Sequence, residues 1–344
     1  MKPSLLARIV WRVACCVALL APAAWSQDAG AFARYALGAR DLGMGGALTA
    51  DVFGGASPYH NPALAPMMPG QNLELSAGLL TMDRQLQSIQ FASPLRPRAG
   101  IAAGIIRGGV SDIDGRDGAG NPTQTLSTEE YAFFIAFGLT FGERISAGFG
   151  LRLYRADLFD DVTPANSLGL SVGVTAKVTE SLALGLAVDD LLARYAWDTS
   201  DAFTGGTSTT DRFPVRLRLG GAYQLNAGRG VLTAEVEVRA RTVEARSTEV
   251  IFDGGTPVER ATDTSLSLSS AQVRLGGEYW IAEPFGVRAG YDRLGVGEFG
   301  ESTPSLGFAL RQQIGELDAR FDYAAQLEPF GNSLAHFLSL SVNL

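Results

Sequence analysis

Residues 131–155, YAFFIAFGLTFGERISAGFGLRLYR, contain two alternating stretches separated by a short link at Gly142-Glu143. In the first stretch the odd-numbered positions carry the large side chains Tyr131, Phe133, Ile135, Phe137, Leu139 and Phe141. In the second stretch large apolar residues alternate with small or charged ones, as in FGLRL at 149–153. A period of two residues places each set on one side of a β-sheet. The stretch therefore predicts an antiparallel hairpin with one apolar face.

Comparable patterns recur along most of the remaining chain, although they are weak in the second and third segments. We predict strands at 71–80, 84–93, 98–107, 129–140, 144–155, 167–178, 181–189, 213–224, 230–243, 270–280, 284–293, 304–313, 315–326 and 335–344. Most are about ten residues long, the length that a tilted strand needs to cross a bilayer. The chain has no apolar run of 18 residues or more, so it predicts no transmembrane helix.

The links between these segments alternate in length from the third segment onward. Links of a few residues follow positions 140, 178, 224, 280 and 313, whereas links of about 8 to 23 residues follow 107, 155, 189, 243, 293 and 326. Outer-membrane barrels have short periplasmic turns and long external loops. We therefore predict an all-β fold, a transmembrane antiparallel β-barrel of about 14 strands over residues 71–344, with both ends periplasmic.

Aromatic residues near the strand ends predict two girdles at the membrane interfaces. The predicted periplasmic girdle contains Phe141, Tyr223, Tyr279, Trp280 and Phe285. The predicted outer girdle contains Tyr131, Phe213, Tyr291 and Tyr323.

The segment before the first strand differs from the rest of the chain. Residues 38–66, GARDLGMGGALTADVFGGASPYHNPALAP, are rich in glycine and alanine and carry few charges. We predict that residues 27–70 form a short N-terminal plug inside the barrel. Gly43, Gly45 and Gly46 do not fit a phosphate-binding loop, because 33–41 is not the buried strand such a loop follows. We interpret them as positions of close packing.

The first 26 residues are typical of a cleaved secretory signal peptide. Lys2, Arg8 and Arg12 precede a short apolar core, and Ala24-Trp25-Ser26 fits a cleavage site. Cleavage there removes both cysteines and changes the formal net charge from −8 to −11. An acidic mature chain argues against nucleic-acid binding. The expected location is the outer membrane of a Gram-negative-type envelope, with outer-membrane lipid as a partner.

The sequence offers little to an enzyme or to a metal site. His60 and His336 are the only histidines, no GxSxG motif surrounds a serine, and no cysteine remains after cleavage. The acidic stretch DIDGRDG at 112–118 lacks the spacing of a calcium loop, although a loose external calcium site is an alternative to a solvated loop. We predict no catalytic residue, no metal and no cofactor.

Charged residues occupy strand positions that face the lumen by parity. The basic ones are Arg152, Arg216, Arg218, Arg239, Arg241, Arg274 and Arg288, and the acidic ones are Glu235, Glu237, Glu278, Asp292, Asp318 and Asp322. One interpretation is a ladder of ion pairs that stiffens the wall. The other is a ligand-binding site in which arginines hold a carboxylate headgroup through paired hydrogen bonds.

Several stretches at both ends of the mature chain resemble the PorV/PorQ family of outer-membrane proteins, which is related to the FadL long-chain fatty-acid transporters. They are GARDLGMGGALTA (38–50), NPALA (61–65), PVRLRLGGAYQL (214–225), VRLGGEYWI (273–281), FGVRAGYDR (285–293) and LDARFDYAAQLEPFGNSLAHFLSLSVNL (317–344). The resemblance implies a fourteen-stranded barrel with a plug whose turn lies at Asn61, Pro62 and Ala63. His60 and Leu344 depart from it, since members often carry an aromatic at the first position and many barrels end in one.

The resemblance to PorV implies a non-enzymatic role in protein export by type IX secretion. The barrel would bind the C-terminal domains of secreted cargo and pass them to export-machinery proteins for surface attachment. The alternative is FadL-like transport of a long-chain fatty acid or another hydrophobic ligand. A third reading is a structural or surface-interaction barrel whose loops bind a partner.

Overall fold

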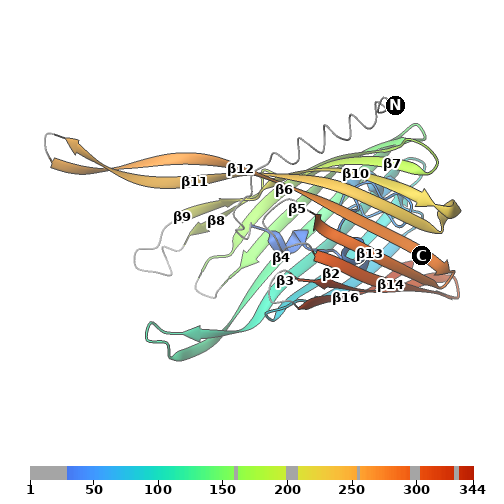
Figure 1. Cartoon of the computed structure of the whole chain (residues 1–344), viewed down its shortest axis with the longest axis horizontal. Coiled ribbons are helices and arrows are strands. Elements are labelled where there is room, and N and C mark those ends of the chain that lie inside the picture. The colour runs from blue at the N-terminus through green and yellow to red at the C-terminus, as the bar shows by residue number, and fades with distance from the viewer. Residues whose placement is uncertain (1–28, 159–161, 199–207, 254–255, 295–302, 329–332) are drawn as a thin grey trace, which may run out of the picture.

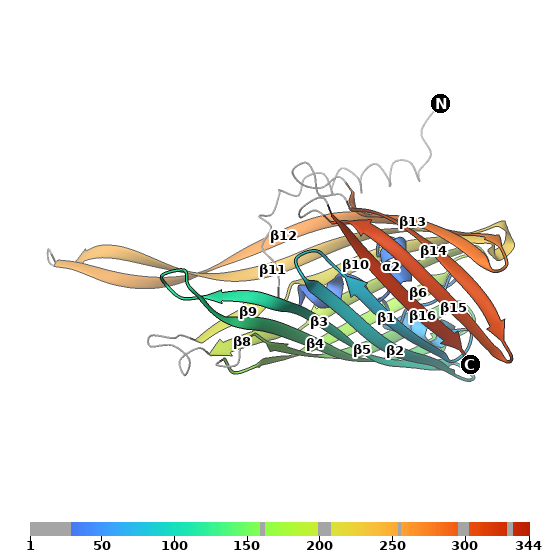
Figure 2. The ribbon, with the colours of Figure 1, turned by 90° about the horizontal axis from the view of Figure 1, so that it is seen from below.

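The computed structural model describes residues 29–158, 162–198, 208–253, 256–294, 303–328 and 333–344. The predicted signal peptide, residues 1–26, lies outside the described residues. Fourteen antiparallel strands form a closed barrel in the order β1-β2-β3-β4-β5-β6-β7-β10-β11-β12-β13-β14-β15-β16, and β16 pairs back with β1. Figures 1 and 2 show this wall as tilted strands around short helical pieces. The predicted fold class and strand number are confirmed.

The strands of the barrel lie close to the predicted segments. They are β1 (Asn72–Leu79), β2 (Arg84–Leu95), β3 (Ala99–Arg116), β4 (Pro122–Phe141), β5 (Ile145–Asp157), β6 (Ala165–Lys177), β7 (Leu182–Leu191), β10 (Val215–Leu225), β11 (Gly230–Asp253), β12 (Thr256–Ala282), β13 (Phe285–Leu294), β14 (Thr303–Ile314), β15 (Leu317–Leu327) and β16 (Leu334–Asn343). A separate hairpin, β8 (Arg194–Asp198) with β9 (Ser208–Arg212), lies between β7 and β10. The short 3-10 helix η3 (Asn226–Gly228) forms the turn between β10 and β11.

The alternation sorts side chains as the sequence predicts. Large apolar side chains on the outer face are exposed, as with Ile135 at 55% and Leu219 at 55%, whereas inward charged residues such as Arg218 and Glu237 are buried. This apolar-out, polar-in wall is the arrangement of a barrel in lipid. Among the described residues, no helix is both long and apolar enough to cross a membrane.

Two links that we predicted as loops are extensions of the strands. The backbone of 108–128 continues the β3–β4 hairpin, and that of 244–269 continues β11 and β12. Residues 241–253 of β11 pair only with β12, because β10 stops pairing with β11 at Ala240. Figure 1 shows this hairpin, which we call the hairpin arm, projecting far beyond the barrel rim. The prediction of loops there is wrong, because strands that leave the membrane keep pairing without an apolar face.

The plug lies inside the wall as three short helical pieces. They are η1 (Ala31–Arg34), α2 (Ala39–Gly43) and η2 (Pro62–Met67). η2 lies against β2 to β6, and α2 lies against β13 to β16. The chain therefore crosses the lumen from one side to the other before it enters β1.

The plug also contacts the junction where the barrel closes. The backbone N–H of Ala39 donates to Ser339 Oγ of β16 over 2.8 Å, and Ser88 Oγ of β2 donates to the carbonyl oxygen of Leu37 over 2.5 Å. β1 lies between these two strands. Plug residues thus bind on both sides of the first strand, where it meets the last.

Candidate functional site in the barrel lumen

A ring of glycines on the inner wall brings the plug backbone against the strands. A Cβ atom added at any of these positions would meet plug atoms, most of them backbone atoms. We call Gly100, Gly138, Gly148, Gly173, Gly185, Gly220, Gly276 and Gly290 the glycine belt. Several are direct register partners, including Gly100 with Gly138, Gly138 with Gly148 and Gly148 with Gly173. The belt leaves no room for a side chain, and so none for a solute, between wall and plug at these positions.

The predicted plug-motif residues lie on this contact surface. Asn61 is fully buried, accepts from the N–H of Ala63 over 3.0 Å, and donates to Thr49 O over 2.8 Å and to Thr175 Oγ1 over 3.0 Å. It therefore caps η2 and ties the plug to β6 at the same time. Pro62 and Ala63 rest on Gly148 of the belt.

The predicted plug glycines lie on the opposite side of the lumen. Gly45 has a φ of 60°, and a Cβ there would overlap backbone atoms of β12 and β13. Gly46 has a φ of 71° and faces the Arg274 side chain, and Gly43 faces Arg288 and Ala324. These contacts are of the kind expected for the close packing that we predicted for the three glycines, and their plug-motif role stays a prediction.

The first group of lumen charges centres on the end of β7. Asp189 and Asp190 are both buried, although neighbouring residues of a strand normally point to opposite faces. A register shift between β6 and β7 and a φ of 61° at Asp190 mark a bulge that turns both carboxylates inward. Arg152 and Arg216 reach Asp190 over 3.3 and 3.0 Å.

Arg218 of β10 connects this group to the plug. Its guanidinium binds Asp189 over 2.5 Å and contacts Nδ1 of His60 over 3.2 Å. Nε2 of His60 in turn lies 2.7 Å from Asp41 of α2. A guanidinium can only donate, so Nδ1 is the acceptor and His60 holds its proton on Nε2, toward Asp41.

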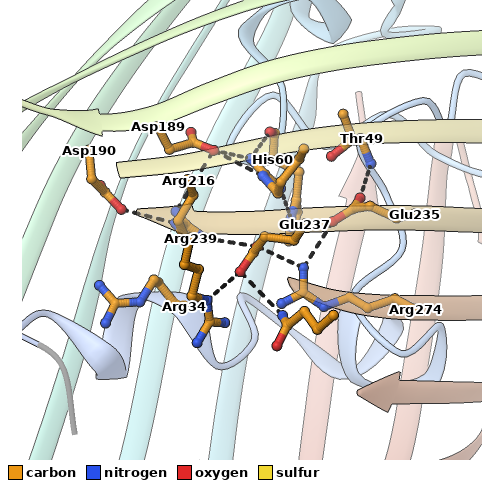
Figure 3. Close-up of polar contacts among 12 residues, drawn as sticks. Arg34, Thr49, His60, Asp189, Asp190, Arg216, Glu235, Glu237, Arg239 and Arg274 are labelled. Carbon is orange, nitrogen blue, oxygen red and sulfur yellow. Dashed lines mark hydrogen bonds and ion pairs between the residues drawn. The ribbon is translucent and has the colours of Figure 1, made fainter. Parts of the chain in front are cut away.

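A second group of charges lies on β11 to β13. Arg274 contacts Glu235 and Glu237, both over 2.9 Å, and Asp292 over 2.7 Å. Arg239 also pairs with Glu237. Figure 3 shows this group beside that around Asp189, with Glu235 accepting from the backbone of Thr49 in the plug.

The third group joins β12, β13 and β15 to α2. Glu278 accepts from Arg288 over 2.6 Å and from Arg40 of the plug over 3.0 Å. Arg40 also pairs with Asp51 over 2.5 Å. Burial acts to lower the pKa of Arg40, but the carboxylates of Glu278 and Asp51 raise it above its ordinary value. Arg40 therefore stays charged at the plug–wall contact.

Every predicted lumen arginine with a described side chain thus has carboxylate partners. These are Arg152, Arg216, Arg218, Arg239, Arg274 and Arg288, and the side chain of Arg241 lies outside the described residues. A small cavity of about 20 Å³ lies between Arg218, Arg274 and the plug, with room for about one water molecule. The pairing favours the wall-stiffening interpretation, and the headgroup-binding hypothesis stays a prediction.

An apolar cluster occupies the lumen between this charged region and the end that carries the long hairpins. Its wall residues include Leu86, Ile106, Phe134, Tyr154 and Phe337, all buried. The plug residues that fill it are Ala29, Phe32, Ala33, Ala36 and Leu37. We call the wall part of this cluster the apolar chamber, which in this structure is filled by the chain's own N-terminal residues.

The chamber is covered by aromatic side chains at the mouth of the barrel. Phe213 lies 4.7 Å from Tyr154 and 4.9 Å from Tyr195 of β8, between ring centroids. The prediction that Phe213 belongs to the outer girdle is wrong, because its ring is 4% exposed and packs inside the mouth. Tyr59 of the plug donates from its hydroxyl to Ala33 O, and burial raises the pKa of that phenol.

Among the described residues, no group of three or more His, Cys, Asp or Glu side chains could hold a metal ion. In the acidic loop, Asp117 accepts from the backbone of Ala119 and Asn121, each over 2.9 Å, and closes the turn. Hydrogen bonds from the Asn121 side chain and backbone lower the pKa of this carboxyl.

Sequence reasoning missed three parts of the site. Asp190 was missed because the bulge breaks the period of two. Arg40 and Asp51 were signalled only as rare charges in a segment of small residues. The glycine belt was visible as glycines at inward parity, such as Gly148 and Gly150 beside Arg152, but nothing in a single strand shows what approaches them.

No family model and no curated protein matches this sequence. Solved structures match in fold. The Pseudomonas putida toluene transporter TodX is 15% identical with a TM-score of 0.58, and the match covers 89% of this chain and 97% of that one. A Pseudomonas aeruginosa FadL homologue gives 14% identity, a TM-score of 0.57 and coverages of 89% and 97%. The CymD monoaromatic hydrocarbon channel is 14% identical with a TM-score of 0.55, and the match covers 90% of this chain and 97% of that one. This chain therefore has the fold of the FadL-type outer-membrane barrels.

Proposed function

We propose that this protein is a non-enzymatic outer-membrane barrel that carries hydrophobic compounds inward. The apolar chamber is the observation that supports this most directly. Phe134 of β4, Ile106 of β3 and Phe337 of β16 point into the lumen, where an open aqueous pore would carry polar side chains. Ligand pockets are typically concave and mostly apolar, with a few polar groups at their edges.

The substrate class follows from the chamber and from what the similar structures are said to carry. TodX is described as a toluene transporter and CymD as a monoaromatic hydrocarbon channel. We infer that the compound is a monoaromatic hydrocarbon, a long-chain fatty acid or a similar apolar molecule.

We propose the following division of the chain. Residues 1–26 direct export and are removed, residues 27–70 act as the plug, and residues 71–344 form the membrane-spanning wall. The lumen arginines hold the plug to the wall through shared carboxylates such as Glu278. Because the glycine belt closes the gap beside the plug along β3 to β7, β10, β12 and β13, we propose that the plug shifts during uptake through the lumen.

Uptake and binding of labelled toluene and oleate test the proposal. Phe134→Ala removes an aromatic ring from the chamber, and with it about 1.5–3 kcal/mol of apolar contact to a bound compound. The variant should therefore bind toluene and oleate about tenfold more weakly, or weaker still. Phe133→Ala is the matched control, since Phe133 is the next residue in the chain and its side chain is 48% exposed on the outer face. Equal binding of both probes by the two variants would contradict a chamber site.

Export of proteins, as the PorV resemblance implies, is the second candidate. The feature that favours it is the hairpin arm, whose 13 residues of β11 beyond Ala240 reach about 40 Å at ~3.3 Å per residue. If the arm receives cargo C-terminal domains or export-machinery proteins, shortening it should abolish their co-purification. Phe134→Ala should leave that co-purification intact.

A further inference from the structure

The lipid-facing side of the wall carries a groove that the transport proposal does not use. It has a volume of about 600 Å³ and crosses β15, β16, β1, β2, β3 and β4 on the outer face. These strands lie next to one another in the barrel, and Figure 2 shows several of them side by side. Its apolar lining includes Leu75, Ile89, Ile105, Phe321 and Leu338. We call it the outer groove.

The groove exists because one outward position is small. Ala77 of β1 stands opposite Leu338 of β16 and opposite Gln87 of β2. Its neighbours on the same face of β1, Leu75 and Leu79, are large and exposed. A methyl group in place of a long side chain therefore leaves a depression between three strands.

One end of the groove is polar. Arg107 of β3 donates to Gln87 Oε1 over 2.8 Å and to Glu129 of β4, which also accepts from the Tyr131 hydroxyl. Tyr131 and Arg107 both line the groove. They lie toward the end with the long hairpins, since β3 and β4 continue from here to Arg116 and Pro122. The groove thus begins toward the outer membrane surface and descends across the strands to Phe321, near the middle of β15.

We propose that the outer groove binds one lipid of the outer leaflet, with an acyl chain along the groove and a headgroup phosphate at Arg107. Five strand spacings of ~4.8 Å give the groove a length of about 24 Å. The chains of one leaflet span about 15 Å, half of the hydrocarbon thickness, so one chain fits. The five N–H groups of a guanidinium suit a phosphate, and the protein groups that share them are Gln87, Glu129 and the Tyr131 hydroxyl.

Glu129 gives the proposal its sharpest test. In this structure its carboxylate holds Arg107, so a phosphate must compete with it for the same guanidinium. Removing that charge should strengthen lipid binding, whereas removing Arg107 should weaken it. A lipid that merely coats the barrel has no reason to respond in opposite directions to these two changes.

The experiment is native mass spectrometry of the full-length protein purified from its membranes in mild detergent. Wild type should retain about one phosphate-bearing lipid per barrel. Arg107→Gln should lower retention about tenfold, because it removes a charged hydrogen bond to the phosphate. Ala77→Leu fills the depression and should also lower retention, because the acyl chain loses its place in the groove. Glu129→Gln should raise it severalfold.

Two control variants lie outside the groove. Ala147→Leu fills an outward alanine of β5, and Arg155→Gln removes an outward arginine that pairs with Asp157 over 3.0 Å. Both should retain lipid as wild type does. Folding of every variant is checked by the heat-dependent shift in its gel mobility.

The proposal is overturned if wild type retains no lipid, or if the groove variants and the control variants retain it equally. A bound fatty acid without phosphate would also overturn it, because the occupant would then be cargo and not a resident lipid. If Arg107→Gln or Ala77→Leu does not fold, Glu129→Gln still decides, since unchanged retention in that variant removes Arg107 as the headgroup contact.

Discussion

At the scale of single residues, the inner wall fits the plug because glycines, which have no side chain, stand at the points of contact. Gly148 lies against the backbone of Pro62 and Ala63, and Gly100 lies against that of Ala65. Any Cβ at these positions pushes on plug backbone, which cannot rotate away as a flexible side chain can. Wall and plug are therefore fitted to each other without side chains between them.

Gly148→Val tests this fit. Overpacking a well-packed contact costs about 1–3 kcal/mol, so the variant should unfold at lower urea and its plug should be cut faster by a protease. Gly221→Val is the control, because the nearest atoms to a Cβ there are a Leu184 side-chain atom at 3.6 Å and the Ala183 carbonyl at 4.0 Å. Equal losses for the two variants would mean that plug contact does not set the cost.

Glu278→Gln tests the ion pairs. Glu278 serves both Arg288 and Arg40, and all three side chains are buried. Removing one partner of a buried pair costs about 3–5 kcal/mol, because a charge stays buried without compensation. Asp157→Asn breaks a pair with Arg155 that is 40–47% exposed, and it should cost less than about 1 kcal/mol. Urea unfolding in detergent micelles measures both, and similar values would contradict a structural role for Glu278.

At the scale of elements, the strands that cross the membrane could be read from the sequence because lipid imposes the period of two. β1, β5 and β10 begin within two residues of their predicted starts. The extensions of β11 and β12 could not be predicted from the sequence. Outside lipid neither face of a strand needs to be apolar, and backbone pairing alone requires no particular residue types. β8 and β9 were hidden for the same reason inside a long polar link.

The 3-10 helix η2 offers a test of how one element is held. Asn61→Asp keeps an oxygen for the N–H of Ala63 but loses the amide donors to Thr49 and Thr175. Because Asn61 is fully buried, the new carboxylate would also face the carbonyl oxygen of Thr49, and we expect a loss of about 3–5 kcal/mol. Asn61→Ala loses the cap and the donors but buries no charge, so it should cost about 1–3 kcal/mol. Protease sensitivity of the plug should rise from wild type to Ala and then to Asp, and an Asp variant as resistant as wild type would contradict the role of the amide donors.

At the scale of the whole molecule, the fold followed from local patterns while the site did not. Alternation and link lengths sufficed for a closed barrel, because each strand reports its own faces. The partners of Arg152 and Arg218 depend on a bulge in β7 and on where the plug runs, and both are set by contacts between distant segments. The ligand-binding interpretation of the arginines therefore could not be weighed from parity alone.

A disulfide between plug and wall tests whether the plug must move. A Cβ at Gly220 would lie 3.5 Å from that of Ala50, within the range of disulfide geometry. The only native cysteines are Cys15 and Cys16 in the predicted signal peptide, so Ala50→Cys with Gly220→Cys forms one defined bridge. Oxidised protein should lose uptake of toluene or oleate and regain it on reduction. Unchanged uptake by the locked protein would show that the compound bypasses the belt.

The contacts of the plug at the β1–β16 junction also bear on how the chain folds. Ala39 and Ser339 are 300 residues apart in sequence, yet they share a hydrogen bond beside the first strand. Contacts between residues so far apart in the sequence form slowly, because the chain loses the entropy of the long intervening loop before the contact stabilises the structure. In the closed ring, residues 37–39 and β1 together form the surface on which β16 rests. A chain in which residues 37–39 reach β2 before β16 arrives would therefore offer its last strand a ready partner surface, and the beginning of the chain would guide the closure of the ring.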